Sequence, residues 1–169
     1  MGGASADVLI EGGRIAAVGR VEARPGVAVE DGGGAIVVPG LIDAHTHLDK
    51  TLWGMPWYRN ETGADLRAMI DNEREARTRL GLDPHRQSMR HAILLAANGA
   101  SHIRSHVDID TDHGLAMLDG VLATREALRG VIDIEIVAFP QSGLLCRPGT
   151  LELIDAGLRA GAEVVGGLD

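Results

Sequence analysis

The two histidines His45 and His47 have the clearest potential for chemistry in this sequence. One residue separates them, and they follow an apolar run that begins at Pro39-Gly40. Along a strand, side chains two positions apart point to the same side. Two imidazoles at the end of one strand can therefore bind the same divalent ion, and they supply half of a typical metal site. The same parity places Asp43 on the side of the histidines, as a candidate partner for them. The alternative is a strand carboxylate that accepts hydrogen bonds from the backbone.

Other polar candidates lie close to the expected ends of strands. His106 and Asp108 end a segment of alternating character over 101–108, and we expect them to face the same opening as the two histidines. The alternative is an internal hydrogen-bonded pair that supports the sheet. Asp49 and Lys50 follow the second histidine, and we expect them to form an ordinary ion pair at the rim.

Two further side chains are candidates for contact with a substrate. Gln141 follows a strand that ends at Phe139-Pro140, and its amide can donate and accept hydrogen bonds at once. It could instead brace its loop. Trp53 and Trp57 lie in the segment after the first histidine strand, where a planar substrate could stack, although packing within the loop is an equal alternative.

The elements that must position these residues follow from periodicity and turn signals. Strands are expected over 7–11, 14–19, 35–38, 101–108, 131–139 and 163–167, besides the histidine strand that begins at 39. The first two are expected to pair as a hairpin through a tight turn at Gly12-Gly13. Helices are expected over 63–79, 83–98, 112–128 and 150–159. The first has apolar residues at helical spacing, namely Leu66, Met69, Ile70 and Leu80, and the second starts with Asp83 as the N-cap and Pro84 in its first position. Strands joined by helices favour a parallel α/β sheet. We therefore expect two domains: a small β element at 1–38 and an α/β region at 39–169.

Composition narrows the partners and the compartment. The 169 residues carry a formal net charge of -8, which argues against nucleic acid and anionic membranes. The single cysteine, Cys146, suits a reducing cytoplasm. Neither a signal peptide nor a membrane-spanning run is recognisable, so we expect a cytoplasmic protein.

Four segments together resemble a known enzyme family. They are 37–50, 105–108, 136–143 and 162–169, and they are similar to the amidohydrolase superfamily, in particular to its cytosine deaminase-like branch. The resemblance implies a partial (β/α)8 TIM-type barrel, about its first half, preceded by a small β-sandwich element. It also implies one divalent metal ion, Zn or Fe, with His45 and His47 as ligands and Gln141 on the amide edge of the substrate ring.

The resemblance further implies a reaction and a substrate class. The expected function is metal-dependent hydrolysis of non-peptide C–N bonds in a small cyclic amidine or amide, with cytosine as the best single substrate. The expected full-length protein is a homo-oligomer that acts on a small cyclic nitrogenous compound.

The length of the sequence conflicts with a complete enzyme of this family. The family's remaining metal ligand and proton-transfer residues would lie beyond residue 169, and such a barrel needs about 250 residues. We therefore expect a truncated gene product or a piece of a longer enzyme, inactive when isolated. The alternative is a catalytically inactive α/β fragment that needs a partner chain or its missing C-terminal half.

Overall fold

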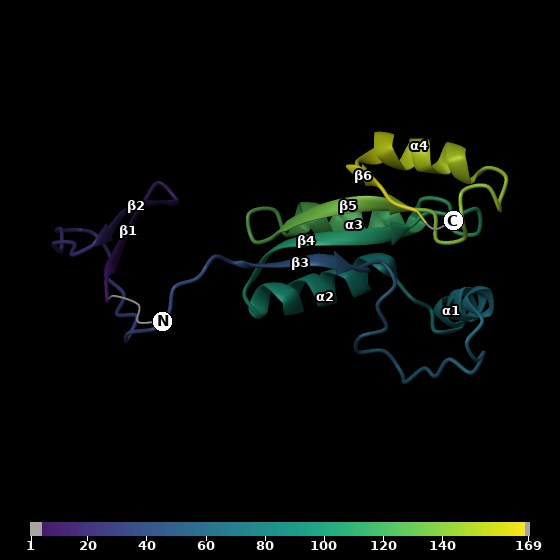
Figure 1. The fold of residues 1–169 in the computed structure, drawn as a ribbon, viewed down its shortest axis with the longest axis horizontal. Coiled ribbons are helices and arrows are strands. Elements are labelled where there is room, and N and C mark those ends of the chain that lie inside the picture. The colour runs from purple at the N-terminus through teal and green to yellow at the C-terminus, as the bar shows by residue number, and fades with distance from the viewer. Residues whose placement is uncertain (1–4, 168–169) are drawn as a thin grey trace. The chain divides into compact units, whose positions relative to one another are not determined.

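The chain forms two compact units, 1–39 and 40–169. The structure is a computed structural model, and it describes residues 5–167 (Figure 1). None of the helices in that range is long and apolar enough to cross a membrane.

The first unit contains one antiparallel hairpin. Strands β1 (Asp7–Glu11) and β2 (Arg14–Gly19) pair, with Glu11 opposite Arg14. The two-residue turn between them is Gly12-Gly13, and both glycines have positive φ, at 57° and 74°. Such φ values match the twist of a tight hairpin and favour glycine strongly. The hairpin predicted from the sequence is therefore confirmed.

The prediction of a strand at 35–38 is wrong. The structure shows no strand there, and Ile36, Val37 and Val38 are largely exposed. Apolar, β-branched residues favour a strand only when a neighbouring strand pairs with them. No described strand pairs with this segment.

The second unit is a four-stranded parallel sheet with helices between its strands. Its elements are β3 (Leu41–Thr46), α1 (Leu66–Arg79), α2 (Pro84–Ala97), β4 (Ala100–Asp108), α3 (Ala116–Ala127), β5 (Asp133–Phe139), α4 (Thr150–Ala160) and β6 (Val164–Val165). The strand order is β3-β4-β5-β6, and all three pairings are parallel. The predicted α/β class with a parallel sheet is confirmed.

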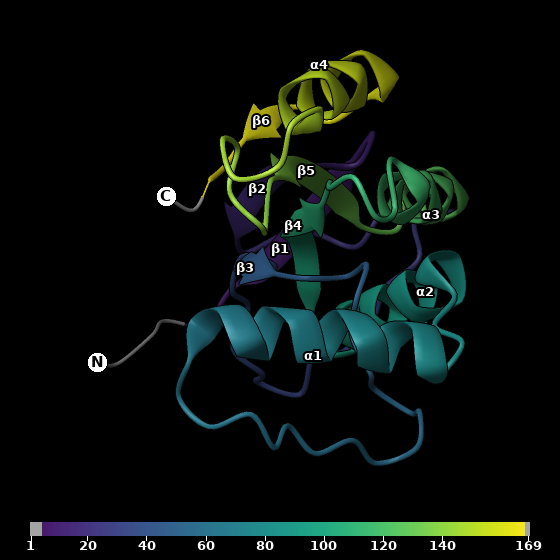
Figure 2. The ribbon, with the colours of Figure 1, turned by 90° about the vertical axis from the view of Figure 1, so that its right-hand side faces the viewer.

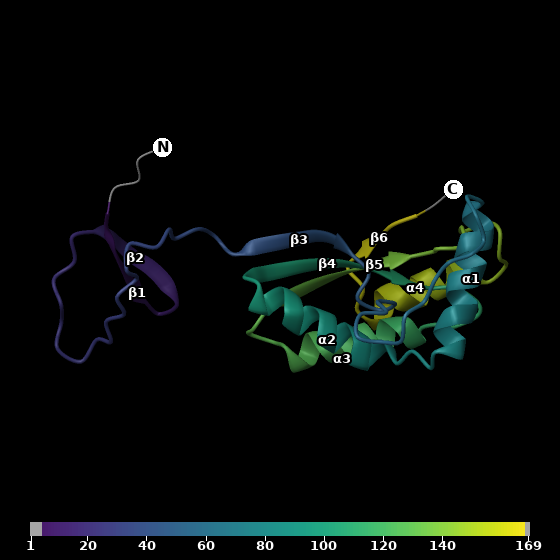
Figure 3. The same cartoon turned by 90° about the horizontal axis from the view of Figure 1, so that it is seen from below.

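The two faces of this sheet have different surroundings. Helices α2 and α3 cover one face (Figure 3). The core between these helices and the sheet contains Ile103, Val107, Leu118, Val121 and Ile136. On the other face, side chains of alternate residues such as His102 and Arg104 are exposed. This alternation is the period of two expected for a strand with unlike faces.

Helix α1 takes a different position. It runs across the carboxyl ends of the strands instead of covering a face (Figure 2). It begins at Leu66 because the Asp65 side chain accepts a hydrogen bond from the Ala68 N–H at 3.0 Å. Leu66 and Met69, which the helical spacing suggested as inward-facing, are exposed, whereas Ala76 and Arg77 are buried.

Helix boundaries were predicted well where caps are strong and less well elsewhere. Helix α2 starts as expected, with Asp83 as the N-cap and Pro84 in the first turn. Helix α3 begins at Ala116 instead of residue 112. The reason is a turn in which Asp110 accepts hydrogen bonds from the N–H groups of Asp112 and His113, at 2.9 and 3.2 Å.

Candidate active site

The two sequence-predicted histidines meet at the carboxyl end of β3. Their ring centroids are 5.8 Å apart, with 52° between the ring planes. Burial is the main cause that lowers the pKa of His47 to about 4, with the Lys50 ammonium second. His47 is therefore a neutral imidazole at neutral pH, which is the form that binds metal ions. Its Nδ1 atom is buried without a hydrogen-bond partner in the described structure.

An irregularity in β3 separates Asp43 from the histidines. Asp43 pairs with Ile103 and Thr46 pairs with Ser105, so the register shifts between these two pairs. Such a bulge reverses the alternation of side chains. The Asp43 side chain lies on the face of the sheet that the helices cover. There its negative charge acts to raise the pKa of His91 on α2, whereas burial, the larger effect, lowers that pKa. The parity argument that placed the Asp43 side chain beside the two imidazoles is therefore wrong. The alternative of a backbone-capped carboxylate is confirmed, because Asp43 Oδ1 accepts a hydrogen bond from the His45 backbone N–H at 3.2 Å.

A third histidine joins the pair from the neighbouring strand. The ring of His106 stacks on that of His45, with centroids 4.0 Å apart and 24° between planes. The Phe139 ring, at the end of β5, presents its edge to His106 and His47 at 5.5 and 6.0 Å. Three adjacent strands thus place four rings together at one end of the sheet. We call His45, His47, His106 and Phe139 the ring cluster.

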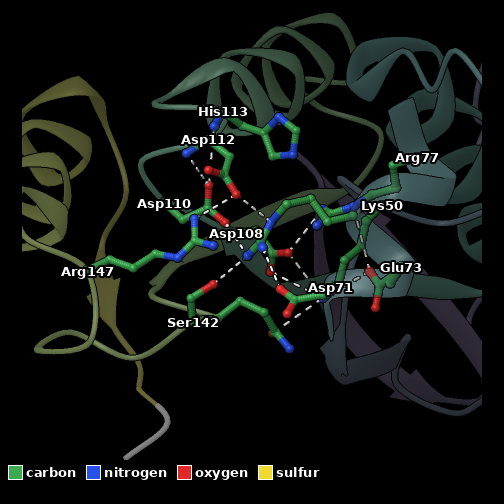
Figure 4. A network of polar contacts seen from close by, with 12 residues as sticks. Lys50, Asp71, Glu73, Arg77, Asp108, Asp110, Asp112, His113, Ser142 and Arg147 are labelled. Atoms are coloured by element: carbon green, nitrogen blue, oxygen red, sulfur yellow. Dashed lines mark hydrogen bonds and ion pairs between the residues drawn. The ribbon is translucent and has the colours of Figure 1, made fainter. Parts of the chain in front are cut away.

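A dense group of charges (Figure 4) lies near His47, whose pKa both the Lys50 ammonium and the Asp108 carboxylate affect. Lys50 Nζ lies 3.2 Å from the Asp108 carboxylate and 3.5 Å from Glu73 Oε1. Arg77, from α1, donates to Asp108 Oδ2 at 3.1 Å. We call Lys50, Glu73, Arg77 and Asp108 the Lys50 cluster.

Asp49 does not form the rim ion pair with Lys50 that the sequence suggested. Its side chain is fully buried and accepts a hydrogen bond from the Asp108 N–H at 2.9 Å. Burial raises the pKa of Asp49, and the neighbouring Asp108 carboxylate raises it further. Lys50 instead pairs with residues distant in sequence because the turn after His47 carries its side chain towards β4 and α1.

The structure places the two predicted substrate contacts differently. Gln141 lies two residues beyond β5, and its Oε1 accepts a hydrogen bond from Lys50 Nζ at 3.3 Å. It therefore adjoins the Lys50 cluster. The backbone carbonyl of Trp53 is held by Gln87 and Arg90 of α2, and its side chain is exposed. Within residues 5–167, no hydrogen bond or ring contact joins Trp53 to the ring cluster.

Arginines of α1 are the residues that sequence reasoning missed. Arg74 binds Asp110, Asp112 and Ser142, which lie in loops after β4 and β5. Arg77 is 2% exposed. A signal for Arg77 existed: it lies seven residues after Ile70 and so shares its inward helical face. From the sequence alone, these arginines resemble part of an ordinary polar helix surface.

The site fits a metal ion only in part. Residues 5–167 contain no group of three His, Cys, Asp or Glu side chains placed to hold one. A catalytic zinc site usually has three protein ligands. His45 and His47, whose rings lie close together at the end of one strand, fit as two members of such a set. The Nδ1 atom of His47 has no hydrogen-bond partner in the described structure and is therefore free to coordinate an ion.

Comparison with known proteins identifies the family of the chain. Residues 28–163 match the model of the amidohydrolase family, and the chain belongs to this family. The predicted resemblance to the amidohydrolase superfamily is therefore confirmed.

Individual relatives narrow the comparison. The chain is 31% identical to N-isopropylammelide isopropyl amidohydrolase of Pseudomonas sp. (strain ADP), over 96% of this chain and 41% of the relative. The crystal structure of N-isopropylammelide isopropylaminohydrolase from Burkholderia multivorans ATCC 17616 is 55% identical. The match covers 97% of this chain and 41% of the Burkholderia chain, with a TM-score of 0.90.

A deaminase structure is also similar. 5-Methylcytosine deaminase from Klebsiella pneumoniae, liganded with 5-fluorocytosine, is 29% identical over 96% of this chain and 40% of that one, with a TM-score of 0.76. The chain spans about two fifths of the length of these relatives. The names of these relatives describe hydrolases of N-isopropylammelide and a deaminase of 5-methylcytosine.

Proposed function

We propose that this chain carries part of the active site of a metal-dependent hydrolase for non-peptide C–N bonds in a small cyclic amidine or amide. The observation that carries the proposal is the convergence of His45 and His47 close to Lys50, the hydrogen-bond partner of Gln141, at one end of a parallel sheet. In barrels of parallel strands, this carboxyl end is where active sites lie. Family membership and the named reactions of the relatives support the same function.

Each residue has a distinct part in this proposal. His45 and His47 hold one divalent ion, Zn or Fe. Such an ion, when bound, lowers the pKa of a coordinated water towards neutrality and so supplies a nucleophile. Gln141 orients the ring of the substrate through its amide, and Trp53 offers an exposed aromatic face on which a planar ring can stack. A cytosine-like or ammelide-like ring, with a leaving amino or alkylamino group, suits these contacts.

The proposal extends to the organisation of the protein. We infer that residues 1–38 contribute to a small β-sandwich element and that 39–169 form the N-terminal part of the barrel. The chain supplies two of the metal's ligands, and further ligands come from elsewhere in the active protein, which we expect to be a cytoplasmic homo-oligomer.

Metal analysis of the purified protein tests the central step. After loading with Zn and desalting, His45→Ala and His47→Ala should each retain less than about a tenth of the metal that the unaltered protein retains, because loss of one of few ligands weakens a site severely. His102→Ala, on the neighbouring strand, is the matched control. Equal metal content in all four proteins would refute the proposal.

A second candidate is an inactive α/β fragment that needs a partner chain or further chain to cover its sheet. The observation in its favour is the exposure of apolar side chains on both edge strands: Leu41 and Ile42 on β3 and Val165 on β6. Light scattering discriminates. A monomer that unfolds in one cooperative step would argue against this candidate, whereas self-association without any bound metal would favour it.

A further inference from the structure

The Asp108 carboxylate joins two cations that come from different parts of the chain. It is 1% exposed at the end of β4. Arg77 of α1 donates to its Oδ2 at 3.1 Å, and Lys50 Nζ lies 3.2 Å from it (Figure 4). Oδ2 of this buried carboxylate accepts hydrogen bonds from both cations, which limits its freedom to turn. Asp108 therefore fixes the position of Lys50.

The Lys50 ammonium makes two hydrogen bonds and one further ion pair. An ammonium has three N–H donors and no acceptor. Three acceptors surround this one: the Asp108 carboxylate at 3.2 Å, Gln141 Oε1 at 3.3 Å and Glu73 Oε1 at 3.5 Å. The Lys50 side chain is only 10% exposed. An exposed ion pair would leave the ammonium free to move, but this one is held on three sides.

This arrangement determines how the Gln141 amide is turned. Because Lys50 can only donate, it selects the amide oxygen of Gln141 and not the amide nitrogen. The Nε2 group has no hydrogen-bond partner among residues 5–167, and Gln141 is only half-buried. The amide thus keeps its oxygen towards the protein and leaves both N–H donors for a ligand.

We propose that Arg77, Asp108 and Lys50 are positioning residues that turn the Gln141 amide so that the site selects a ring edge presenting a hydrogen-bond acceptor. This inference rests on the proposed function, in which Gln141 contacts the substrate ring. A ring carbonyl or an unprotonated ring nitrogen satisfies the Nε2 donor. An amino group in the same place sets donor against donor and leaves both unpaired in a partly desolvated site.

The orientation of the amide can be tested without any substrate. The sequence contains one lysine, Lys50, and two glutamines, Gln87 and Gln141. Labelling with ¹⁵N-lysine and ¹⁵N-glutamine therefore gives one ammonium signal and two side-chain amide signals in NMR spectra of the full chain. Gln87, which donates to the carbonyls of Thr51 and Trp53, is the internal reference.

The expected spectra are specific. The Lys50 ammonium should be visible near neutral pH because it is shielded from exchange. Lys50→Met and Arg77→Met should both shift the Gln141 amide signal and leave that of Gln87 in place, and Arg77→Lys should restore it in part. Arg79→Met, an exposed arginine on the same helix, is the control. An unmoved Gln141 signal in both Met variants, with folding verified by circular dichroism, would overturn the inference.

Ligand binding tests the selectivity. Cytosine carries a ring carbonyl where 2,4-diaminopyrimidine carries an amino group. We expect cytosine to bind at least about tenfold more tightly, since the amino group would leave donors unpaired. The preference should fall to about twofold or less in Lys50→Met, and Gln141→Glu, which presents only acceptors, should reverse it.

The outcomes separate the two proposals. If the spectra change as expected but neither ring binds, the proposed substrate class fails while the positioning of Gln141 stands. If cytosine binds but the unaltered protein shows no preference over 2,4-diaminopyrimidine, or Lys50→Met keeps the preference, the positioning role is refuted while the proposed function survives.

Discussion

The ring of His106 stacks on the ring of His45 across the β3–β4 junction, with centroids 4.0 Å apart and 24° between planes. His45 is itself exposed, so little else limits its rotation. The stack therefore orients one of the two proposed metal ligands, and Phe139 supports it from β5 through an edge contact with His106.

Removing the stacked ring should weaken metal binding. His106→Ala should raise the Kd for Zn by about tenfold, because fixing a freed side chain on binding costs up to about 1.5 kcal/mol. His106→Phe keeps a flat ring and should raise the Kd by less than about threefold. Competition against a chromophoric chelator measures both. His102→Ala, on the same strand, is the control. Equal affinities for the Ala and Phe variants would show that stacking does not orient His45.

Stability should depend on pH through His47. Its pKa is about 4 in the folded protein, lowered by burial from the ordinary value of 6.5 that the unfolded chain keeps. Between these values the unfolded chain binds the proton and the folded chain does not. The free energy of unfolding should therefore rise as the pH increases from about 4 to 6.5. The slope of this free energy against pH is set by the difference in bound protons between the two states, to which His47 contributes up to about one proton.

The His47 contribution can be isolated by substitution. Urea unfolding of the unaltered protein and of His47→Asn, measured at several pH values across this window, should give curves that diverge as the pH rises. The asparagine variant should have the shallower slope because it has no proton to bind. Parallel curves for the two proteins would contradict the lowered pKa. Burial lowers the pKa of His91 and His106 too, and both remain in the variant, so their effects cancel in the difference.

The contact between α2 and α3 depends on Gly120. A Cβ built there would lie 2.7 Å from the backbone nitrogen of His85 and 2.6 Å from Pro84 Cβ. Alanine normally stabilises a helix interior by up to about 1 kcal/mol relative to glycine. Here Gly120→Ala should instead lower the free energy of unfolding by about 1–3 kcal/mol, since the backbone of α2 must move away.

Gly157 in α4 offers a matched comparison. Its added Cβ would meet the Ile109 side-chain end at 2.6 Å, which can rotate, instead of a backbone. Gly157→Ala should therefore cost less than Gly120→Ala in urea unfolding. A stabilised Gly120→Ala protein would show that the two helices pack less closely than the structure indicates.

Local chemistry in the sequence was enough for much of the fold. The turn at Gly12-Gly13, the cap at Asp83-Pro84 and the alternation of strands and helices each depend on residues close together in the chain. The same holds for the placement of His45 and His47 at the end of one strand. These features were predicted because neighbouring residues alone decide their geometry.

Tertiary structure decided the rest of the site. The bulge that separates the Asp43 side chain from the two imidazoles lies where β3 pairs with β4. The lack of a strand at 35–38 reflects the lack of a pairing partner among the described strands. The partners of Lys50 come from α1, β4 and the segment after β5. Such contacts join residues far apart in sequence, so only the folded arrangement fixes them, and with them the orientation of Gln141.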